Sequence, residues 1–198
     1  MKFRNVLKKR SGRIVIAAVP VAVVATVMMG GVAQGAVPVA FSISGSQFQI
    51  SASQLNGTGF SQYAGTTKDT AGNSHQVAIA NIAQASLANL CQSVVTNLPG
   101  GGKVGIMITA GGGGKPATAT NLQIGMTDLK GDSSFDNIRI GVDASTVNTA
   151  PKGTAGDFAQ DASGIHITNL QQTSWSTTAS VFNLTGMHVQ VTDGTSCF

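Results

Sequence analysis

The chain has 198 residues, a length that suits one domain with its own core and is too short for two. Its formal net charge of +4 comes from the N-terminus, because six of the twelve Lys and Arg residues lie within positions 1–13 and the other six face eight Asp. Those six are scattered singly, so they do not form the clustered basic surface that grips a phosphate backbone, and nucleic acid is excluded as a partner.

Residues 14–35 follow the basic cluster as an uncharged, largely apolar segment that ends in small residues. This order is typical of a secretory signal, with cleavage after Gly35. The alternative is a retained membrane anchor, since about twenty uncharged residues cross a hydrocarbon core of about 30 Å. We therefore expect a signal peptide or N-terminal anchor at 1–35 and one exported domain at 37–198. The domain is expected outside the cell or in the cell envelope under either alternative.

A pattern of alternating apolar residues, closed by Gln, Asp or Asn and then Leu, occurs five times along the exported part. Alternation with period two is typical of a strand with one buried face, and a Gly shortly after the closing Leu, as at Gly57 and Gly131, favours a turn. We therefore expect strands that end in turns. The closing leucines are Leu55, Leu90, Leu129, Leu170 and Leu184.

The fold class expected from this pattern is mainly β, in a single domain of repeated strand-turn units. Successive closing leucines are 35, 39, 41 and 14 residues apart. The first three intervals suit stacked repeat units, and the last interval is too short for one. An antiparallel sandwich and a solenoid-like sheet both remain open. Residues 78–95 fit a strand by alignment and a helix by their alanine content, so at most one short helix is expected there.

The two cysteines, Cys91 and Cys197, both lie in the exported part, where oxidising conditions preserve disulfides. We expect them to form one bridge that ties the end of the chain to its middle. Two unrelated thiols are the alternative.

Catalytic residues are not indicated by any complete motif in the sequence. The glycine runs before Lys103 and Lys115 lack the first Gly and the following Ser or Thr of a phosphate-binding loop. The tripeptide ending in Ser133 matches the one that opens a class of small lipases and esterases, but no Asp-x-x-His segment follows near the C-terminus. Ser133 is therefore expected to be a turn residue.

The three histidines have no partner at metal-ligand spacing, so neither a metal site nor a cofactor is predicted. His166 and His188 each stand between apolar neighbours, and alternation places both on the solvent face of a strand. His75 lies 91 residues before His166. The predicted site residues are therefore the two cysteines alone.

Residues 90–94, 140–144 and 175–179, together with the alternating strands, give the chain a family likeness. Over nearly its whole length the chain resembles an uncharacterised family of secreted or membrane-associated actinobacterial proteins. Members of that family often carry an automatic label of cholesterol esterase, and their genes tend to lie beside one for a small multi-pass membrane protein. The resemblance implies location and class, and it supplies no catalytic residues.

The sequence favours an exported, non-enzymatic envelope or surface protein that acts by binding or assembly. Strand faces rich in Gln, Asn, Ser and Thr suit self-association or contact with a membrane protein partner. A lipid-ester hydrolase that uses Ser133, and a lipid-binding carrier, are the alternatives.

Overall fold

The computed structural model describes residues 44–198, which fold into nine strands and one short 3-10 helix. The predicted signal segment at 1–35 and the predicted start of the domain at 37 lie outside the described residues. Within residues 44–198, no helix has the length and apolar character needed to span a membrane. The elements are β1 (Phe48–Lys68), β2 (Ser74–Ala88), β3 (Leu90–Asn97), β4 (Lys103–Ala110), β5 (Ala117–Asp136), β6 (Arg139–Asp143), η1 (Ala144–Thr146), β7 (Phe158–Thr178), β8 (Val181–Asn183) and β9 (His188–Thr192).

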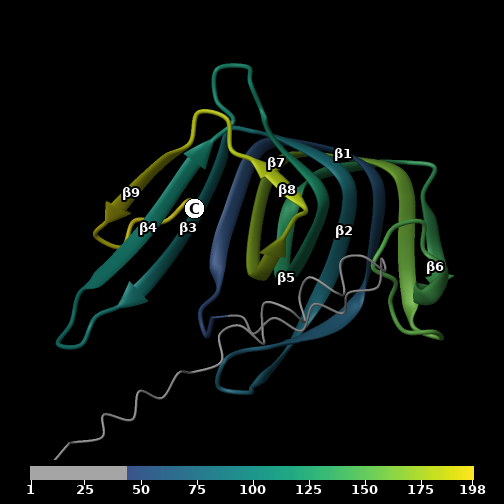
Figure 1. The fold of residues 1–198 in the computed structure, drawn as a ribbon, viewed down its shortest axis with the longest axis horizontal. Coiled ribbons are helices and arrows are strands. Elements are labelled where there is room, and N and C mark those ends of the chain that lie inside the picture. Colours follow the sequence, from purple (N-terminus) through teal and green to yellow (C-terminus); the bar gives the residue numbers. More distant parts are fainter. Residues whose placement is uncertain (1–43) are drawn as a thin grey trace, which may run out of the picture. The chain divides into compact units, whose positions relative to one another are not determined.

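The described strands form one antiparallel sheet in the order β6-β7-β5-β2-β1-β3-β4-β9, with β8 paired to β5. Because β1 also pairs with β7, the four long strands β1, β2, β5 and β7 close into a ring of pairings. β3, β4 and β9 continue the sheet to one side of this ring, and β6 ends the strand order on the other side (Figure 1). The mainly-β prediction is therefore confirmed, as a single sheet in place of the sandwich and the solenoid.

Residues 78–95, which fit a helix or a strand in the sequence, are extended in β2 and β3. Ile82 of β2 lies opposite Phe60 of β1 and Leu122 of β5, so the segment has a hydrogen-bonded strand on each side. A helix here would leave the backbone groups of both neighbours without partners, which costs more than the helical preference of a few alanines supplies. Tertiary pairing therefore overrides local propensity.

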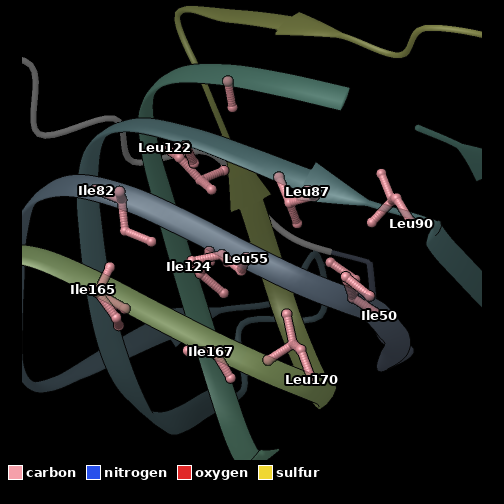
Figure 2. Close-up of a cluster of buried hydrophobic side chains, with 14 of the residues drawn as sticks. Ile50, Leu55, Ile82, Leu87, Leu90, Leu122, Ile124, Ile165, Ile167 and Leu170 are labelled. Carbon is pink, nitrogen blue, oxygen red and sulfur yellow. The ribbon is translucent and has the colours of Figure 1, made fainter. Parts of the chain in front are cut away.

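Apolar side chains at alternate positions of the long strands fill the interior of the ring (Figure 2). Leu55 is 2% exposed and lies opposite Leu87 of β2 and Ile167 of β7. Directly opposed residues of antiparallel strands share one face, so these three mark the inner face of the ring. Burial of each such side chain contributes about 1.5–3 kcal/mol, which makes the interior the main stabilising feature. The core also includes Ile50, Phe60, Ile82, Leu90, Leu122, Ile124, Ile165 and Leu170.

The closing leucines of the predicted repeats do not generally end strands. β1, β5 and β7 continue past Leu55, Leu129 and Leu170, so the prediction of turns at these positions was wrong. Gly57 lies within β1, where a Cβ would come within 2.6 Å of Cγ2 of Ile82. The position needs glycine because the strands pack closely there, and a turn is not the reason.

Four asparagines have positive φ angles between 50° and 54°, two within strands and two in the connections between strands. Such angles are unfavourable for most residues, and Asn tolerates them better than others. Three of the four asparagines are followed by a buried leucine, so each of these kinks turns the next side chain into the core. The repeat pattern therefore marks a kink within β7 at Asn169 and the bend from β2 to β3 at Asn89. The four are Asn89, Asn121, Asn137 and Asn169, and the leucines are Leu90, Leu122 and Leu170.

The three strands β3, β4 and β9, which we call the wing, extend from the ring where Gln49 of β1 pairs with Ser93 of β3. A disulfide joins Cys91 in β3 to Cys197, with an S–S distance of 2.07 Å. The backbone amide of Cys197 also donates to Oγ of Ser93 at 3.0 Å. The bridge predicted from the sequence therefore fastens the C-terminal tail across the wing.

The segment from β6 to β7 covers part of the outer face of the ring. Tyr63 points outward from β1 and packs against Ala144, Val147 and Ala159 in a second, smaller core. Asp161 holds this segment, because its side chain is 1% exposed and accepts two hydrogen bonds from the Arg139 guanidinium, at 2.8 and 2.6 Å. The hydrogen bonds from Arg139 keep the pKa of Asp161 below its ordinary value.

Candidate binding site

A cavity of about 770 Å³ opens at one end of the ring, between the C-terminal half of β1 and the N-terminal half of β2. Gln62, Ala64 and Thr66 line it, and they alternate along β1 in the same phase as the core residue Phe60. Gln62 lies opposite Gln160 of β7, as expected for two residues on one face. The cavity is therefore the mouth of the ring interior, directly beyond the apolar core.

Small side chains explain why this end of the ring is hollow. Ala64 of β1 lies opposite Ala78 of β2, whereas further along the same two strands Leu55 lies opposite Leu87. The interior is thus filled by leucine and isoleucine over most of its length and left open where alanines face each other.

The cavity wall combines uncharged polar groups with an apolar surface. Nε2 of Gln160 donates to Oε1 of Gln62 at 2.7 Å, which joins the adjacent strands β7 and β1 along the cavity wall. Phe158 stands at the rim and is 64% exposed. Within residues 44–198, the side chains that line this cavity carry no charge. The other lining residues are Tyr63, Gly65, Gln76, Val77, Met126 and Thr127.

The turn between β1 and β2 is held beside the cavity by a polar cluster. Oδ1 of Asp69 accepts the backbone amides of Ala71 and Asn73, each at 2.9 Å, and Oδ2 lies 3.1 Å from Nε2 of His75. The side-chain hydrogen bonds from Asn73 and then His75 lower the pKa of Asp69 to about 2. The His75 ring stacks on Trp175 with ring centroids 3.8 Å apart. These contacts fix the strand end that carries Gln76, a cavity residue.

A family of unknown function, DUF6230, matches residues 44–198 of the chain. The chain belongs to this family. No curated protein and no solved structure gives a significant match. The ring, the wing and the cavity all lie within the DUF6230 region, so all three are features of the part of the chain that defines its family membership.

In this DUF6230 chain Ser133 lies inside β5, so its predicted placement in a turn was wrong. The strand passes this point with a register shift between Lys130 and Asp132, which keeps it paired to β7. Ser133 lies opposite Ile167, and the neighbouring His166 points to the other face of the sheet. The register therefore separates Ser133 from the one histidine of the strand it pairs with.

The histidines lie in three different places on the described chain. His166 is on the outer face, with Nδ1 3.0 Å from Oδ1 of Asn56 and Nε2 3.1 Å from Oδ2 of Asp136. His188 is exposed on β9, and His75 belongs to the turn beside the cavity. Among residues 44–198, no three His, Cys, Asp or Glu side chains gather closely enough to hold a metal ion.

The cavity residues were not identified from the sequence. Gln62, Gln76 and Gln160 carry no motif, and nothing in their local sequence separates them from other glutamines on strand faces. The pairing register brings them together, because it places Gln62 and Gln160 opposite each other across 98 residues of chain. The one feature of the sequence that could have identified these residues is the alternation of side chains along β1. It places Gln62, Ala64 and Thr66 on the same face as Phe60.

Proposed function

We propose that the protein is an exported, non-enzymatic binding module of the cell envelope or extracellular space, whose ligand is a small uncharged amphipathic molecule held at the mouth of the ring. The observation that carries this proposal is the uncharged lining of a cavity that continues an apolar core. The Cys91–Cys197 disulfide supports the extracellular setting, since such bonds persist in oxidising compartments.

The chemistry of the wall selects the class of ligand. A volume of about 770 Å³ falls within the range of about 300–1,000 Å³ that is usual for small-molecule sites. A charged ligand would lose hydration here without gaining a counter-charge, which is costly. The amides of Gln62, Gln76 and Gln160 offer both donors and acceptors to a neutral polar group, while Met126 and Phe158 offer contact to an apolar body. Neutral lipids with a small polar head fit this description.

The first experiment identifies what the protein carries. The full chain is expressed in a host that exports it, and the purified protein is analysed by native mass spectrometry before and after solvent extraction. We expect an added mass that extraction removes and that matches an uncharged amphipathic molecule. A bound anionic lipid as the dominant species contradicts the proposal.

A second experiment locates the ligand with a matched pair of variants. The Ala64→Phe variant fills the mouth of the ring, and Thr118→Phe adds the same ring to an exposed position on β5. We expect at least tenfold weaker binding of a fluorescent cholesterol probe in Ala64→Phe and unchanged binding in Thr118→Phe. Equal binding of the probe by both variants would show that the ligand does not bind in the cavity.

The cholesterol esterase label of the resembling proteins suggests a second activity on the same class of neutral lipid. Ser133 is the motif-based nucleophile for that activity, and its register opposite Ile167 places it away from His166. We expect the Ser133→Ala variant to turn over a short-chain ester at the same rate as the unchanged protein. A loss of turnover in that variant supports the hydrolase and weighs against a purely binding function.

A further inference from the structure

The wing carries an unusual face for a sheet at the surface of a protein. Ile106 of β4 lies opposite Val94 of β3 and Val191 of β9, and Val191 is 75% exposed. One step along, Ile108 lies opposite Val189, which is 50% exposed. These paired residues share one face, so aliphatic side chains run across the wing, half-buried at Val94 and Ile108 and exposed at Ile106 and on the outer strand. Contiguous exposed apolar surface of this kind marks an interaction site.

The opposite face of the wing is already covered. Cys91 and Ser93 lie on that face, and they hold the C-terminal tail through the disulfide and the hydrogen bond from Cys197. Gln190 is on the same side, where its Nε2 lies 3.4 Å from Sδ of Met107. The tail therefore leaves the apolar face exposed, and no strand among residues 44–198 pairs with the outer edge of β9.

The two ends of the sheet differ in how their edges are protected. β6 has charged residues, Arg139 and Asp143, at its ends and a register shift between Ile140 and Val142. Charges and irregularities of this kind on an edge strand prevent it from pairing with the edge of another sheet. β9 pairs with β4 through five consecutive residues, and its sequence His-Val-Gln-Val-Thr contains no Lys, Arg, Asp, Glu or Pro. Of the two strands that end the main strand order of the described chain, β9 is the one with an unprotected edge.

We propose that β9 pairs antiparallel with β9 of a second copy, about a two-fold axis through Gln190, so that the two wings form one continuous sheet. In this register Val189 lies opposite Val191 of the second copy, twice, and His188 lies opposite Thr192. All five residues of each strand find a partner, and the aliphatic face continues unbroken across the axis. The strand is therefore complementary to itself, as a two-fold contact requires.

Charge favours a second copy as the occupant. The nearest charged residue to β9 along the chain is Asp193, and the two-fold register places it opposite Met187 of the second copy. The two Asp193 side chains are then about six residues apart along the paired strands, which is about 20 Å. That separation is about twice the screening length at 0.1 M salt, so the contact carries little like-charge repulsion. Pairing of β9 with β6 would instead bring this uncharged strand beside one that carries Arg139 and Asp143. This contact is separate from the cavity, so the inference does not depend on the proposed ligand.

Gln190 provides a sharp test because it faces its own copy across the axis. The full chain is expressed and exported, and its association is followed by sedimentation velocity over a range of concentrations. We expect reversible dimers of the unchanged protein and, at low salt, about tenfold weaker association in Gln190→Lys and in Gln190→Glu, since each sets like charges opposite one another. An equimolar mixture of the two variants is expected to regain the dimer.

Rescue by the mixture separates a lost contact from a damaged fold, because two misfolded variants do not restore each other. The Ile140→Lys variant is the matched control, with a charge added to the exposed edge strand β6. It is expected to dimerise like the unchanged protein. A protein that stays monomeric at every concentration, a dimer that Gln190→Lys leaves intact, a mixture that fails to regain the dimer, or open-ended polymers would each overturn the proposal.

Discussion

Asparagines with left-handed backbone geometry shape the long strands at the scale of single residues. Asn169 has a φ of 54°, and Leu170, which follows it, is 1% exposed. The Asn169 side chain donates to Oδ2 of Asp132 on β5 at 3.2 Å, and Asn89 donates in the same way to Oγ of Ser53 on β1 at 3.0 Å. Each kink is therefore fixed both by what Asn tolerates in its backbone and by a bond to the neighbouring strand.

The Asn169→Ala variant is expected to lower the free energy of unfolding by about 1–2 kcal/mol, because an alanine Cβ clashes in the left-handed region. The Asn169→Gly variant loses the same side-chain bond to Asp132 but keeps the backbone freedom, so its loss is expected to be smaller. Urea unfolding of both variants measures the difference. Equal losses would mean that the hydrogen bond, and not the backbone angle, accounts for the asparagine.

Asp69 makes the stability of the β1–β2 turn depend on pH. Its pKa is about 2 in the folded protein, below the ordinary value of 3.8, because Asn73 and His75 hydrogen-bond its charged form. The unfolded chain therefore takes up this proton at a higher pH than the folded protein does. The contribution is complete above about pH 4 and is lost as the pH falls towards 2.

The Asp69→Asn variant is expected to show a smaller fall in melting temperature between pH 4 and pH 2 than the unchanged protein. Asp143 and Asp161 also have lowered pKa values, so both proteins retain some dependence on pH. Asp157→Asn, at an exposed position before β7, is the control and should follow the unchanged protein. Parallel curves for all three proteins would show that Asp69 contributes nothing in this range.

At the scale of elements, the wing depends on its disulfide. β3 is tied to the ring by three residue pairs with β1, from Gln49 to Ser51, and among residues 44–198 the one strand that pairs with β9 is β4. The bond between Cys91 and Cys197 spans 106 residues of sequence and closes most of the described chain into one loop. Such a long loop removes much of the freedom of the unfolded chain.

The double variant Cys91→Ala with Cys197→Ala is expected to lose up to about 4.7 kcal/mol of unfolding free energy, the chain-entropy value for a loop of about 100 residues. Urea unfolding with and without a reducing agent makes the measurement. The reductant should destabilise the unchanged protein by a similar amount and leave the double variant unaffected. A reductant that acts equally on both would show that its effect does not pass through this bond.

At the scale of the whole molecule, closure of the ring requires β1 to lie close to β2 and β7 at the same point. Gly57 is that point, because a Cβ there would come within 2.6 Å of Cγ2 of Ile82 on β2 and 3.0 Å of Cγ2 of Ile165 on β7. Both isoleucines belong to the core, so neither has free space into which to move.

The Gly57→Ala variant is expected to destabilise the protein by about 1–3 kcal/mol through overpacking of the core. Gly45→Ala is the control, because a Cβ at that position meets no heavy atom within 4 Å. Thermal and urea unfolding of the two variants give the comparison. A Gly57→Ala variant as stable as Gly45→Ala would mean that the ring does not close tightly at this residue.

The predictable part of the fold and site follows from local chemistry. Alternation at Ile165 and Ile167 indicated a strand with a buried face, and both residues are buried in β7. The pairing of Cys91 with Cys197 followed from their being the only two cysteines in a chain with an export signal pattern. Strand ends were mispredicted at Leu55 and Leu170, because a Gly or Asn in a long strand serves close packing or a kink as readily as a turn.

The sequence by itself determined the β class, the disulfide and the inward-facing side chains, because period two and cysteine count act within one strand or one pair of residues. Only the tertiary structure decided that β1 pairs with β7 as well as β2, that Gln62 meets Gln160 at the mouth of a cavity, and that β9 lies at an unprotected edge. These features depend on register between segments about 100 residues apart in sequence. A uniform alternating pattern suits many pairings, and the packing of the closed core selects among them.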